Sequence, residues 1–289
     1  MVFIDSKTKY PGGLKVPDIF SKIKNLFGIH QSIYAKPQLV SDIKTCYFYH
    51  TMDIPNYGLI EGEWDLRPNV NAYYGNIDFD QKQVLEIGTS SGFGTFTLEK
   101  LGAKLVSYDL SPDFSWDIVP FYKNDTNITE TSMKKWISKV NKAYWFSHKA
   151  FQSKAKVVYG TVYNIPCQIG KFDIVTVCAV LMHLRDPFLA LQSICNHVSD
   201  TIVVTDAMPE HILNTRKYPI IFRPGVRQEL TKPGSMGTWW YLSPETISDF
   251  LYILGFEETT ISFHKQLWKK PDKSYMEVPF YTVTAHRTF

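Results

Sequence analysis

The sequence predicts an α/β fold built on a doubly wound, mostly parallel sheet. First, short apolar runs alternate with helical segments from about residue 83 onward. Second, a glycine-rich stretch from Gly88 to Gly94 separates the first apolar run from the first helical segment. Third, the alternation stops near the C-terminus, where two strand-like runs follow one another without a helix. A parallel sheet covered by helices on both faces explains the alternation, and an antiparallel edge hairpin explains its end.

Seven strands and four helical segments make up this prediction. The strands are expected at 83–87, 105–109, 156–160, 172–178, 201–207, 258–264 and 279–286, and the helices at 96–102, 131–152, 187–197 and 244–255. Asp186 and Ser243 are the expected N-caps of the last two helices. Each precedes a proline, which is favoured in the first turn of a helix.

The segments outside this alternation are expected to cover the sheet. Residues 1–80 contain many breakers and are predicted to form an N-terminal cap or lid, with an amphipathic helix near residues 18–27. Residues 81–289 are predicted to form the α/β domain. Within it, residues 208–241 are an insertion on the substrate side, after the fifth strand.

The composition is that of a soluble globular protein, with 44% hydrophobic and 20% charged residues in a chain of 289. No apolar run approaches the ~20 residues that span a bilayer, and the N-terminus lacks a signal peptide, so we expect a cytoplasmic location and no membrane partner. The four cysteines form no C-x-x-C pair, so no metal site is predicted.

The net charge of +3 is too small to indicate a nucleic-acid partner, although basic residues gather at 211–233 and 265–273. Two interpretations are open for these segments. They form either a positive rim that favours an anionic acceptor or an ordinary solvated surface.

Two acidic residues flank the glycine-rich stretch. Glu86 ends the first predicted strand, and Asp109 ends the second strand, 21 residues after Gly88. An acid at the end of the second strand can accept hydrogen bonds from the ribose hydroxyls of an adenosine cofactor. The alternative is that the two acids cap a helix and a turn. The spacing favours nucleoside binding.

The glycine pattern and the position of Glu86 indicate which nucleoside cofactor binds. The dinucleotide fingerprint needs glycine at its third and sixth positions, where this chain has Ser90 and Phe93. A carboxylate at Glu86 suits the ammonium group of an amino-acid cofactor better than a pyrophosphate. These observations favour S-adenosylmethionine.

The stretches VLEIGTSSGFG, VSYDL and KFDIVTVCAVLMHLRDP resemble the motifs of class I S-adenosylmethionine-dependent methyltransferases over residues 83–207. The resemblance implies a Rossmann-like seven-stranded sheet. The residues it implies for cofactor binding are Glu86, Gly88, Thr89, Ser90, Gly92, Asp109, Leu110, Thr161, Val162 and Cys178. The third motif often carries Asp where this chain has Thr161, and a backbone contact could replace that side chain.

A looser resemblance covers most of the chain. YFYHTMDIP, EWDLRP, VLMHLRDP and TWWYLSPETISDFLYILGF are similar to the group that includes the tRNA wobble-uridine carboxymethyltransferases. Those enzymes have a tyrosine that helps bind an extra carboxylate on their cofactor, and this chain has Met182 at that position. Methionine cannot donate that hydrogen bond, so ordinary S-adenosylmethionine is expected.

Two histidines are candidates for the general base. His183 follows the fourth predicted strand, at the edge where open α/β sheets bind ligands. The alternative is that His183 only binds a backbone carbonyl. His50 lies in the predicted cap and could close over the acceptor. An amine or thiolate acceptor needs no base.

The candidates for acceptor binding are Arg67, Trp239, Trp240 and Tyr241, and those for adenine stacking are Phe114 and Trp116. Arg67 either grips an anionic group or forms an ion pair with Asp65. Each aromatic ring either faces the cleft or packs against the sheet.

The leading hypothesis is a methyltransferase that acts on oxygen or nitrogen of a small or glycan-like metabolite. An RNA methyltransferase, acting on tRNA for example, is the first alternative. The second is a non-catalytic partner protein that binds the cofactor. The sequence does not specify the acceptor or the oligomeric state.

Overall fold

The computed structural model describes residues 32–114, 116–117, 126–208, 220–222 and 237–288. Tyr34–Phe289 form one compact unit. The helix expected at 18–27 and most of the insertion expected at 208–241 lie outside the described residues.

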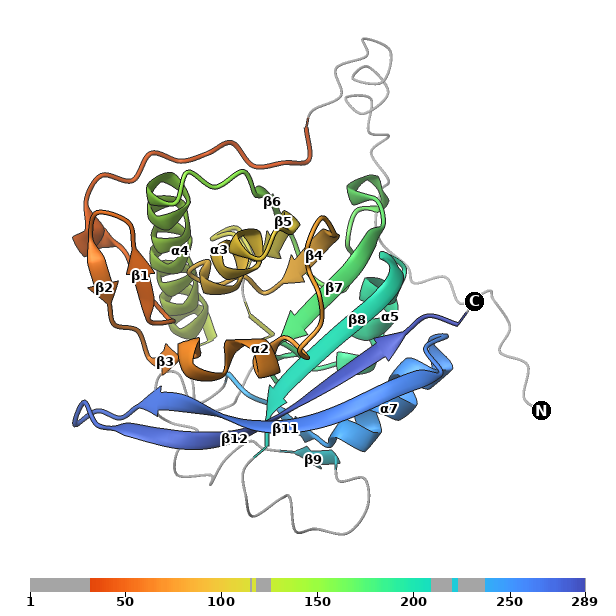
Figure 1. Cartoon of the computed structure of the whole chain (residues 1–289). Helices are drawn as coiled ribbons and strands as arrows, with labels where there is room; N and C mark the ends of the chain where they lie inside the picture. Colours follow the sequence, from red (N-terminus) through yellow and green to blue (C-terminus); the bar gives the residue numbers. More distant parts are fainter. Residues whose placement is uncertain (1–31, 115, 118–125, 209–219, 223–236, 289) are drawn as a thin grey trace, which may run out of the picture. The chain divides into compact units, whose positions relative to one another are not determined.

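The centre of this unit is an eight-stranded sheet with the order β3-β11-β12-β8-β7-β4-β5-β6 (Figure 1). Its strands are β3 (Trp64–Asp65), β4 (Gln83–Ile87), β5 (Lys104–Asp109), β6 (Lys156–Tyr159), β7 (Phe172–Cys178), β8 (Val198–Ala207), β11 (Glu258–Lys269) and β12 (Tyr275–His286). The five strands from β8 to β6 are parallel, and β12 and β11 are antiparallel. The predicted Rossmann-like sheet with an antiparallel hairpin is confirmed.

The structure adds two features to the predicted sheet. β3 is an eighth strand, and its two residues are too few to produce an alternating pattern in the sequence. The hairpin strands β11 and β12 each have 12 residues and are longer than predicted. The added residues 265–269 and 275–278 mix charged or polar side chains with apolar ones, and among them only Gln266 is buried, so they lack the apolar run that marks a buried strand.

Four helices pack on the sheet in two pairs. They are α3 (Phe93–Lys100), α4 (Thr126–Ala150), α5 (Pro187–Cys195) and α7 (Pro244–Ile253). Phe96 of α3 stacks on Phe151, just after α4, and Phe188 of α5 contacts Phe250 of α7. Figure 1 shows α3 and α4 beside β4–β6, and α5 and α7 beside β8 and β12. Connections between parallel strands are right-handed, and the chain proceeds in opposite directions along the sheet from β4 and from β7. The helices therefore fall into two pairs.

The predicted caps of α5 and α7 are present. The Asp186 side chain accepts a hydrogen bond from the Leu189 N–H (2.9 Å), and the Ser243 hydroxyl accepts one from the Thr246 N–H (3.1 Å). Each bond satisfies an N–H group that a helix start leaves unpaired.

The order of the strands reverses between β4 and β7. From β4 the chain proceeds to β5 and β6 on one side, and from β7 to β8 on the other. The loops that leave these strands therefore diverge, and the crevice between them at the carboxyl ends of β4, β5 and β7 is where open α/β sheets bind ligands.

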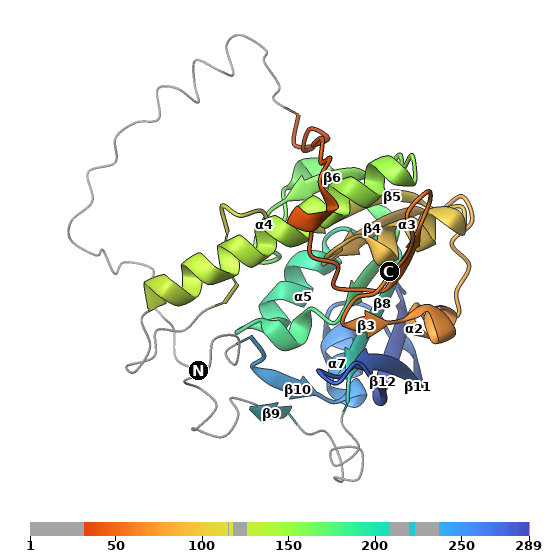
Figure 2. The same cartoon turned by 90° about the vertical axis from the view of Figure 1, so that its left-hand side faces the viewer.

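The segment before β4 crosses this crevice. It contains η1 (Ile43–Thr45), β1 (Met52–Ile54), β2 (Gly58–Ile60), η2 (Arg67–Asn69) and α2 (Val70–Tyr73). η1 lies against α4, next to a hydrogen bond from the Tyr47 N–H to the Lys139 carbonyl (3.0 Å; Figure 2). The buried Ser91 hydroxyl of the glycine-rich turn accepts the Tyr49 N–H (3.2 Å), so this segment is tied directly to the turn.

A short ribbon of β9 (Ile220–Phe222) and β10 (Trp240–Leu242) precedes α7. Two short 3-10 helices, η3 (Cys167–Ile169) and η4 (Leu181–His183), flank β7. Within the described ranges, no helix is long and apolar enough to cross a membrane. The same ranges hold no group of three or more His, Cys, Asp or Glu side chains arranged to bind a metal ion.

Candidate active site

Two adjoining cavities lie at the carboxyl ends of the parallel strands. The first, the Asp109 cavity, has a volume of about 160 Å³, and the second, the Glu86 cavity, has about 70 Å³. The residues that line both are Tyr49, Gly88, Ser90 and Ala179. The two cavities therefore meet at the glycine-rich turn between β4 and α3.

The turn keeps its backbone close to both cavities. Gly88 has a φ of +79°, and a Cβ atom there would lie 2.4 Å from Cγ2 of Val180. A Cβ atom on Gly94 would lie 2.0 Å from Oε1 of Glu86 and 2.2 Å from the Tyr74 hydroxyl. Both positions therefore exclude a side chain, Gly88 for conformation and space, and Gly94 for space.

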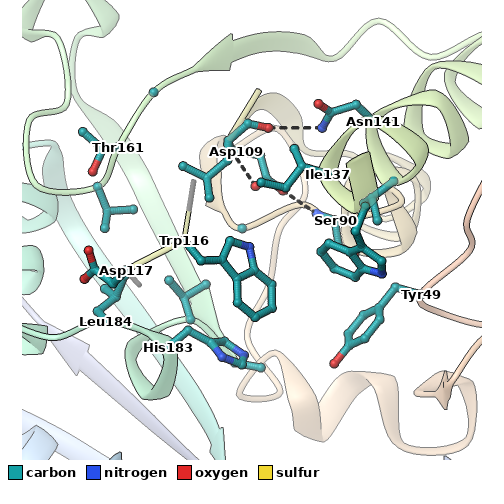
Figure 3. A pocket seen from close by; sticks show the side chains of 18 of the residues that line it. Tyr49, Ser90, Asp109, Trp116, Asp117, Ile137, Asn141, Thr161, His183 and Leu184 are labelled. Atoms are coloured by element: carbon teal, nitrogen blue, oxygen red, sulfur yellow. Dashed lines mark hydrogen bonds between the residues drawn. The ribbon is translucent and has the colours of Figure 1, made fainter. Parts of the chain in front are cut away.

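Asp109 ends β5 and is held by backbone donors. Its carboxylate accepts hydrogen bonds from the N–H groups of Ser90 (2.7 Å) and Leu110 (2.6 Å; Figure 3). Burial raises the pKa of Asp109 above its ordinary value, and these backbone hydrogen bonds oppose that shift. The bond to Ser90 also fixes a residue whose φ is +51°, in the left-handed region. Asp109 thus couples the end of β5 to the turn after β4.

Glu86 lies in β4 next to the turn and is 5% exposed. Its carboxyl group accepts a hydrogen bond from the Thr95 hydroxyl, which continues through Ser107 (2.9 Å) to Tyr144 (2.9 Å). Among the described residues that line the Glu86 cavity there is no lysine or arginine. Burial without a cation raises the pKa of Glu86 to about 8, so the carboxyl group is mostly protonated at neutral pH.

Aromatic rings line the mouth of the Asp109 cavity. The Trp116 ring lies 4.9 Å from the His183 ring and 5.4 Å from the Trp136 ring, and Tyr49 lies 6.0 Å from Trp136. Figure 3 shows Trp116, His183 and Tyr49 facing the same space. They come from the loop after β5, from η4 and from the segment before β4. Distant parts of the sequence therefore form one aromatic wall.

The two candidate bases have different environments. Nδ1 of His183 binds the Gly237 carbonyl. Because a carbonyl only accepts, Nδ1 carries a proton, and Nε2 is the nitrogen that can accept one. His50 is enclosed in the Glu86 cavity, and its buried Nδ1 has no hydrogen-bond partner among the described residues. Burial lowers the pKa of His50 to about 4, so it is neutral at physiological pH.

Most of the residues predicted to bind the cofactor line these cavities. Ser90, Asp109, Leu110, Thr161, Val162 and Gly88 line the Asp109 cavity, and Glu86, Thr89 and Cys178 line the Glu86 cavity. Gly92 lines neither and is the N-cap of α3. The Thr161 carbonyl already accepts a hydrogen bond from the Tyr108 hydroxyl (3.0 Å). The cofactor roles of these residues stay predictions.

The residues predicted to bind the acceptor lie outside both cavities. Arg67 forms a bidentate ion pair with Asp65 (2.8 and 2.7 Å) and lines neither cavity. The indole N–H groups of Trp239 and Trp240 donate to the carbonyls of Asp117 (3.0 Å) and Leu184 (2.9 Å). Tyr241 lies in β10, paired with Ile221. Phe114 is also absent from the lining, whereas Trp116 is part of it.

The structure places further residues in the cavities that the sequence analysis did not select. Trp136, Ile137, Val140 and Asn141 line the Asp109 cavity from one face of α4. Their spacing of one, four and five residues is that of a single helical face, and this was the available signal. Tyr49 and Tyr74 come from the segment before β4. The sequence analysis placed this segment in a cap over the site but selected His50 from it and not these two tyrosines.

The comparison with protein families found a match over the middle of the chain. Residues 85–200 match a family described as a methyltransferase domain. The chain therefore carries a methyltransferase domain over these residues. No curated protein matches the chain in sequence.

Several solved structures are similar to this chain at low sequence identity. The N-terminal domain of EvdMO1, in the presence of S-adenosylhomocysteine and D-fucose, is 16% identical with a TM-score of 0.48, covering 85% of this chain and 92% of that chain. Magnesium protoporphyrin IX methyltransferase from Synechocystis PCC 6803 is 13% identical with a TM-score of 0.45, covering 77% and 82%. The 1,6-didemethyltoxoflavin-N1-methyltransferase of Burkholderia thailandensis is 12% identical with a TM-score of 0.46, covering 78% of each chain.

Proposed function

We propose that the two cavities bind the two halves of S-adenosylmethionine. Asp109, Leu110, Thr161 and Val162 would hold the adenosine portion in the Asp109 cavity, and Glu86 would hold the ammonium group in the Glu86 cavity. The observation that carries this assignment is the pair of carboxyl groups on the adjacent strands β4 and β5, the buried Glu86 and the half-buried Asp109, both next to the turn.

Unsatisfied polar atoms at this site support the same assignment. The hydroxyl oxygen of Ser90 is buried and has no hydrogen-bond partner among the described residues, and Ser90 lines both cavities. Within the same part of the chain, Oδ1 of Asn141 in the Asp109 cavity also has no partner. Buried polar groups normally have partners, so a polar ligand at this place would satisfy both atoms.

We propose that His183 is the base if the acceptor is a hydroxyl. When bound, S-adenosylmethionine supplies an electrophilic methyl group, and the protein contributes orientation and removal of the acceptor proton. His183 lines the Asp109 cavity, and the Gly237 carbonyl directs Nε2 to the accepting role. His50 is the weaker candidate because a base with a pKa of about 4 has little affinity for a proton.

We further propose that the acceptor is a small metabolite methylated at oxygen or nitrogen. The acceptor has to approach the methyl group where the two cofactor cavities meet. The described residues that line these cavities supply three carboxyl groups, from Glu86, Asp109 and Asp117, and no lysine or arginine. Such a lining gives an RNA phosphate or another anionic group no partner and disfavours it electrostatically. A neutral or glycan-like acceptor suits this lining better than RNA.

We also propose that the segment before β4 acts as the lid that was predicted for residues 1–80. Its Tyr49 lines both cavities, and the N–H groups of Tyr49 and His50 approach the Ser91 hydroxyl of the turn (3.2 and 3.4 Å). These contacts link the lid to the same turn that borders both cavities.

The experiment is incubation of a metabolite extract with the protein and methyl-labelled S-adenosylmethionine, followed by mass spectrometry for products heavier by one labelled methyl group. The matched control is the Asp109→Ala variant, which should form none of these products. Parallel incubations contain the RNA fraction at rising salt. Labelled small molecules that are absent with the variant support the proposal. Labelling confined to RNA, and lost steeply as salt rises, would establish the RNA alternative instead.

A further inference from the structure

Asp117 connects the loop after β5 to three other segments. One oxygen of its carboxylate accepts hydrogen bonds from the Arg185 N–H (2.8 Å) and from the Tyr163 hydroxyl. The other oxygen lies 3.7 Å from Nε of Arg185, and the Asp117 carbonyl accepts the Trp239 indole N–H (3.0 Å). The Asp117 side chain is 15% exposed. Both its backbone and its side chain are therefore held by neighbours.

The partners of Asp117 come from separate loops at the carboxyl edge of the sheet. Tyr163 follows β6, Arg185 lies between η4 and α5, and Trp239 precedes β10. The Tyr163 hydroxyl also accepts the Asp186 N–H (3.2 Å), so this cluster is linked to the cap of α5. Asp117 and Tyr163 themselves line the Asp109 cavity.

Trp116 precedes Asp117, and the position of its ring depends on the same loop. The ring lies beside the His183 ring (Figure 3), and its centroid is 5.4 Å from that of the Trp136 ring, which also lines the Asp109 cavity. His183 belongs to η4, and Trp136 belongs to α4. The ring of Trp116 therefore contacts both elements, and its backbone is fixed by the hydrogen bonds of its neighbour.

We propose that Asp117 is a positioning residue that holds Trp116 across the Asp109 cavity and thereby slows the release of the cofactor product. This inference rests on the proposed function, since it assumes that the adenosine portion binds in that cavity. Carboxylate hydrogen bonds in a mostly buried setting are stronger than neutral ones, so Asp117 is suited to fixing a loop. Removing such an anchor should act mainly on dissociation, as changes at one binding site usually do.

The experiment is a stopped-flow measurement of S-adenosylhomocysteine dissociation from the full chain. Asp117→Ala should raise the dissociation rate about tenfold, and Trp116→Ala should do the same. The double variant should release the ligand no faster than the faster single variant, because both changes remove the same wall. Additive effects in the double variant would show that Asp117 does not act through Trp116 and would overturn the proposal.

Three further variants separate this role from a merely structural one. Arg185→Ala keeps the backbone N–H that binds Asp117 and loses only an exposed ion pair, so its dissociation rate should change less than twofold. Asp117→Asn keeps an acceptor oxygen and should restore most of the slow release. Tyr163→Phe removes one donor, and should speed release two- to threefold with an unchanged melting temperature.

The outcomes distinguish this inference from the proposed function. If Asp109→Ala weakens S-adenosylhomocysteine binding but Asp117→Ala and Tyr163→Phe leave its release unchanged, the positioning role is wrong and the cofactor site stands. If the unaltered protein does not bind S-adenosylhomocysteine, the proposed function and this inference both fail. If Asp117→Ala does not fold, the Tyr163→Phe and Asp117→Asn rates decide.

Discussion

The half-buried Asp109 and the buried Glu86 both place a carboxyl group beside one glycine-rich turn, but their partners differ. Two backbone N–H groups hold the Asp109 carboxylate, whereas Glu86 accepts from the Thr95 hydroxyl in a network of neutral side chains. Backbone donors stabilise a carboxylate before any ligand arrives. Hydroxyl groups stabilise a carboxylate more weakly, and burial raises the pKa of Glu86 to about 8. We infer that the Asp109 side is preorganised, and that the Glu86 side becomes charged only when a cationic group binds.

The largest effect is expected for a substitution on the preorganised side, at Asp109. Asp109→Ala removes the acceptor that we assign to the ribose and leaves the N–H groups of Ser90 and Leu110 without their partner. A hydrogen bond to a charged group contributes ~1.5–3 kcal/mol, so calorimetry should find S-adenosylhomocysteine bound about ten- to a hundred-fold more weakly. Asp113→Ala, on the same loop but exposed, should change the affinity less than twofold. Equal effects of the two variants would contradict the ribose assignment.

The next largest effect is expected for a substitution that fills space on the Glu86 side, at Gly94. Gly94→Ala places a methyl group against Oε1 of Glu86 and the Tyr74 hydroxyl, both of which are confined by buried neighbours. Overpacking of this kind costs about 1–3 kcal/mol of stability, so thermal unfolding should occur several degrees lower. Thr97→Ala, at a half-buried position of the same helix, is the control for a change in α3 alone. If Gly94→Ala leaves both melting temperature and S-adenosylhomocysteine affinity unchanged, Glu86 is less confined than we describe.

The pH dependence of binding sharpens the comparison. With a pKa of about 8 in the free protein, Glu86 must lose a proton to pair with an ammonium group, so affinity for S-adenosylhomocysteine should rise from pH 6 to pH 8. The rise is limited to tenfold per pH unit for one proton. Glu86→Gln cannot release this proton, and its affinity should be weak and nearly flat over the same range. A parallel rise in the variant would assign the proton to another group.

The same substitution has a predictable effect on stability. The folded pKa of Glu86 lies above its ordinary value of 4.5, so the folded state holds the proton more tightly, and stability falls as pH rises from about 4.5 to 8. Glu86→Gln has no proton to release over this pH range, so this loss of stability does not occur in the variant. The ligand-free variant should therefore melt at a higher temperature than the unaltered protein at pH 8, and the difference should shrink at pH 5. A variant that is less stable at both values would show that the network through Thr95 needs the acid.

The smallest expected effect concerns Ser90, which lines both cavities. Ser90→Ala keeps the backbone N–H bound to Asp109 and removes only the unpartnered hydroxyl. One neutral hydrogen bond contributes ~0.5–1.5 kcal/mol, so S-adenosylhomocysteine affinity should fall only a few-fold. Unchanged calorimetric affinity would show that the ligand does not use this hydroxyl.

The alternating core was predictable because its strands and helices leave local signals. The runs at β4, β5 and β7 are apolar, Asp186 and Ser243 precede prolines, and all are visible without tertiary information. The glycine-rich turn with its two acids was predictable for the same reason. The residues that we assign to cofactor binding in this turn are close in sequence to the ends of two strands, and strand ends can be located from the local pattern.

The aromatic wall and the anchor at Asp117 were not predictable in this way. Tyr49, Trp116 and Trp136 meet only because the segment before β4 and α4 cross the same crevice, and no local pattern encodes that meeting. Arg67 and Trp240 were candidates for acceptor contacts, and each had a structural alternative. Arg67 forms the alternative ion pair with Asp65, and Trp240 donates to the Leu184 carbonyl.

The most direct test of the central claim is a crystal structure of the protein with S-adenosylhomocysteine. The predicted density has the ribose at the Asp109 carboxylate and the ammonium group at Glu86, with Gly88 and Ser90 between them. Density for the ligand at another place, such as the groove lined by Lys104, Lys154 and Lys156 at the opposite end of the strands, with both cavities empty of ligand, would contradict the assignment.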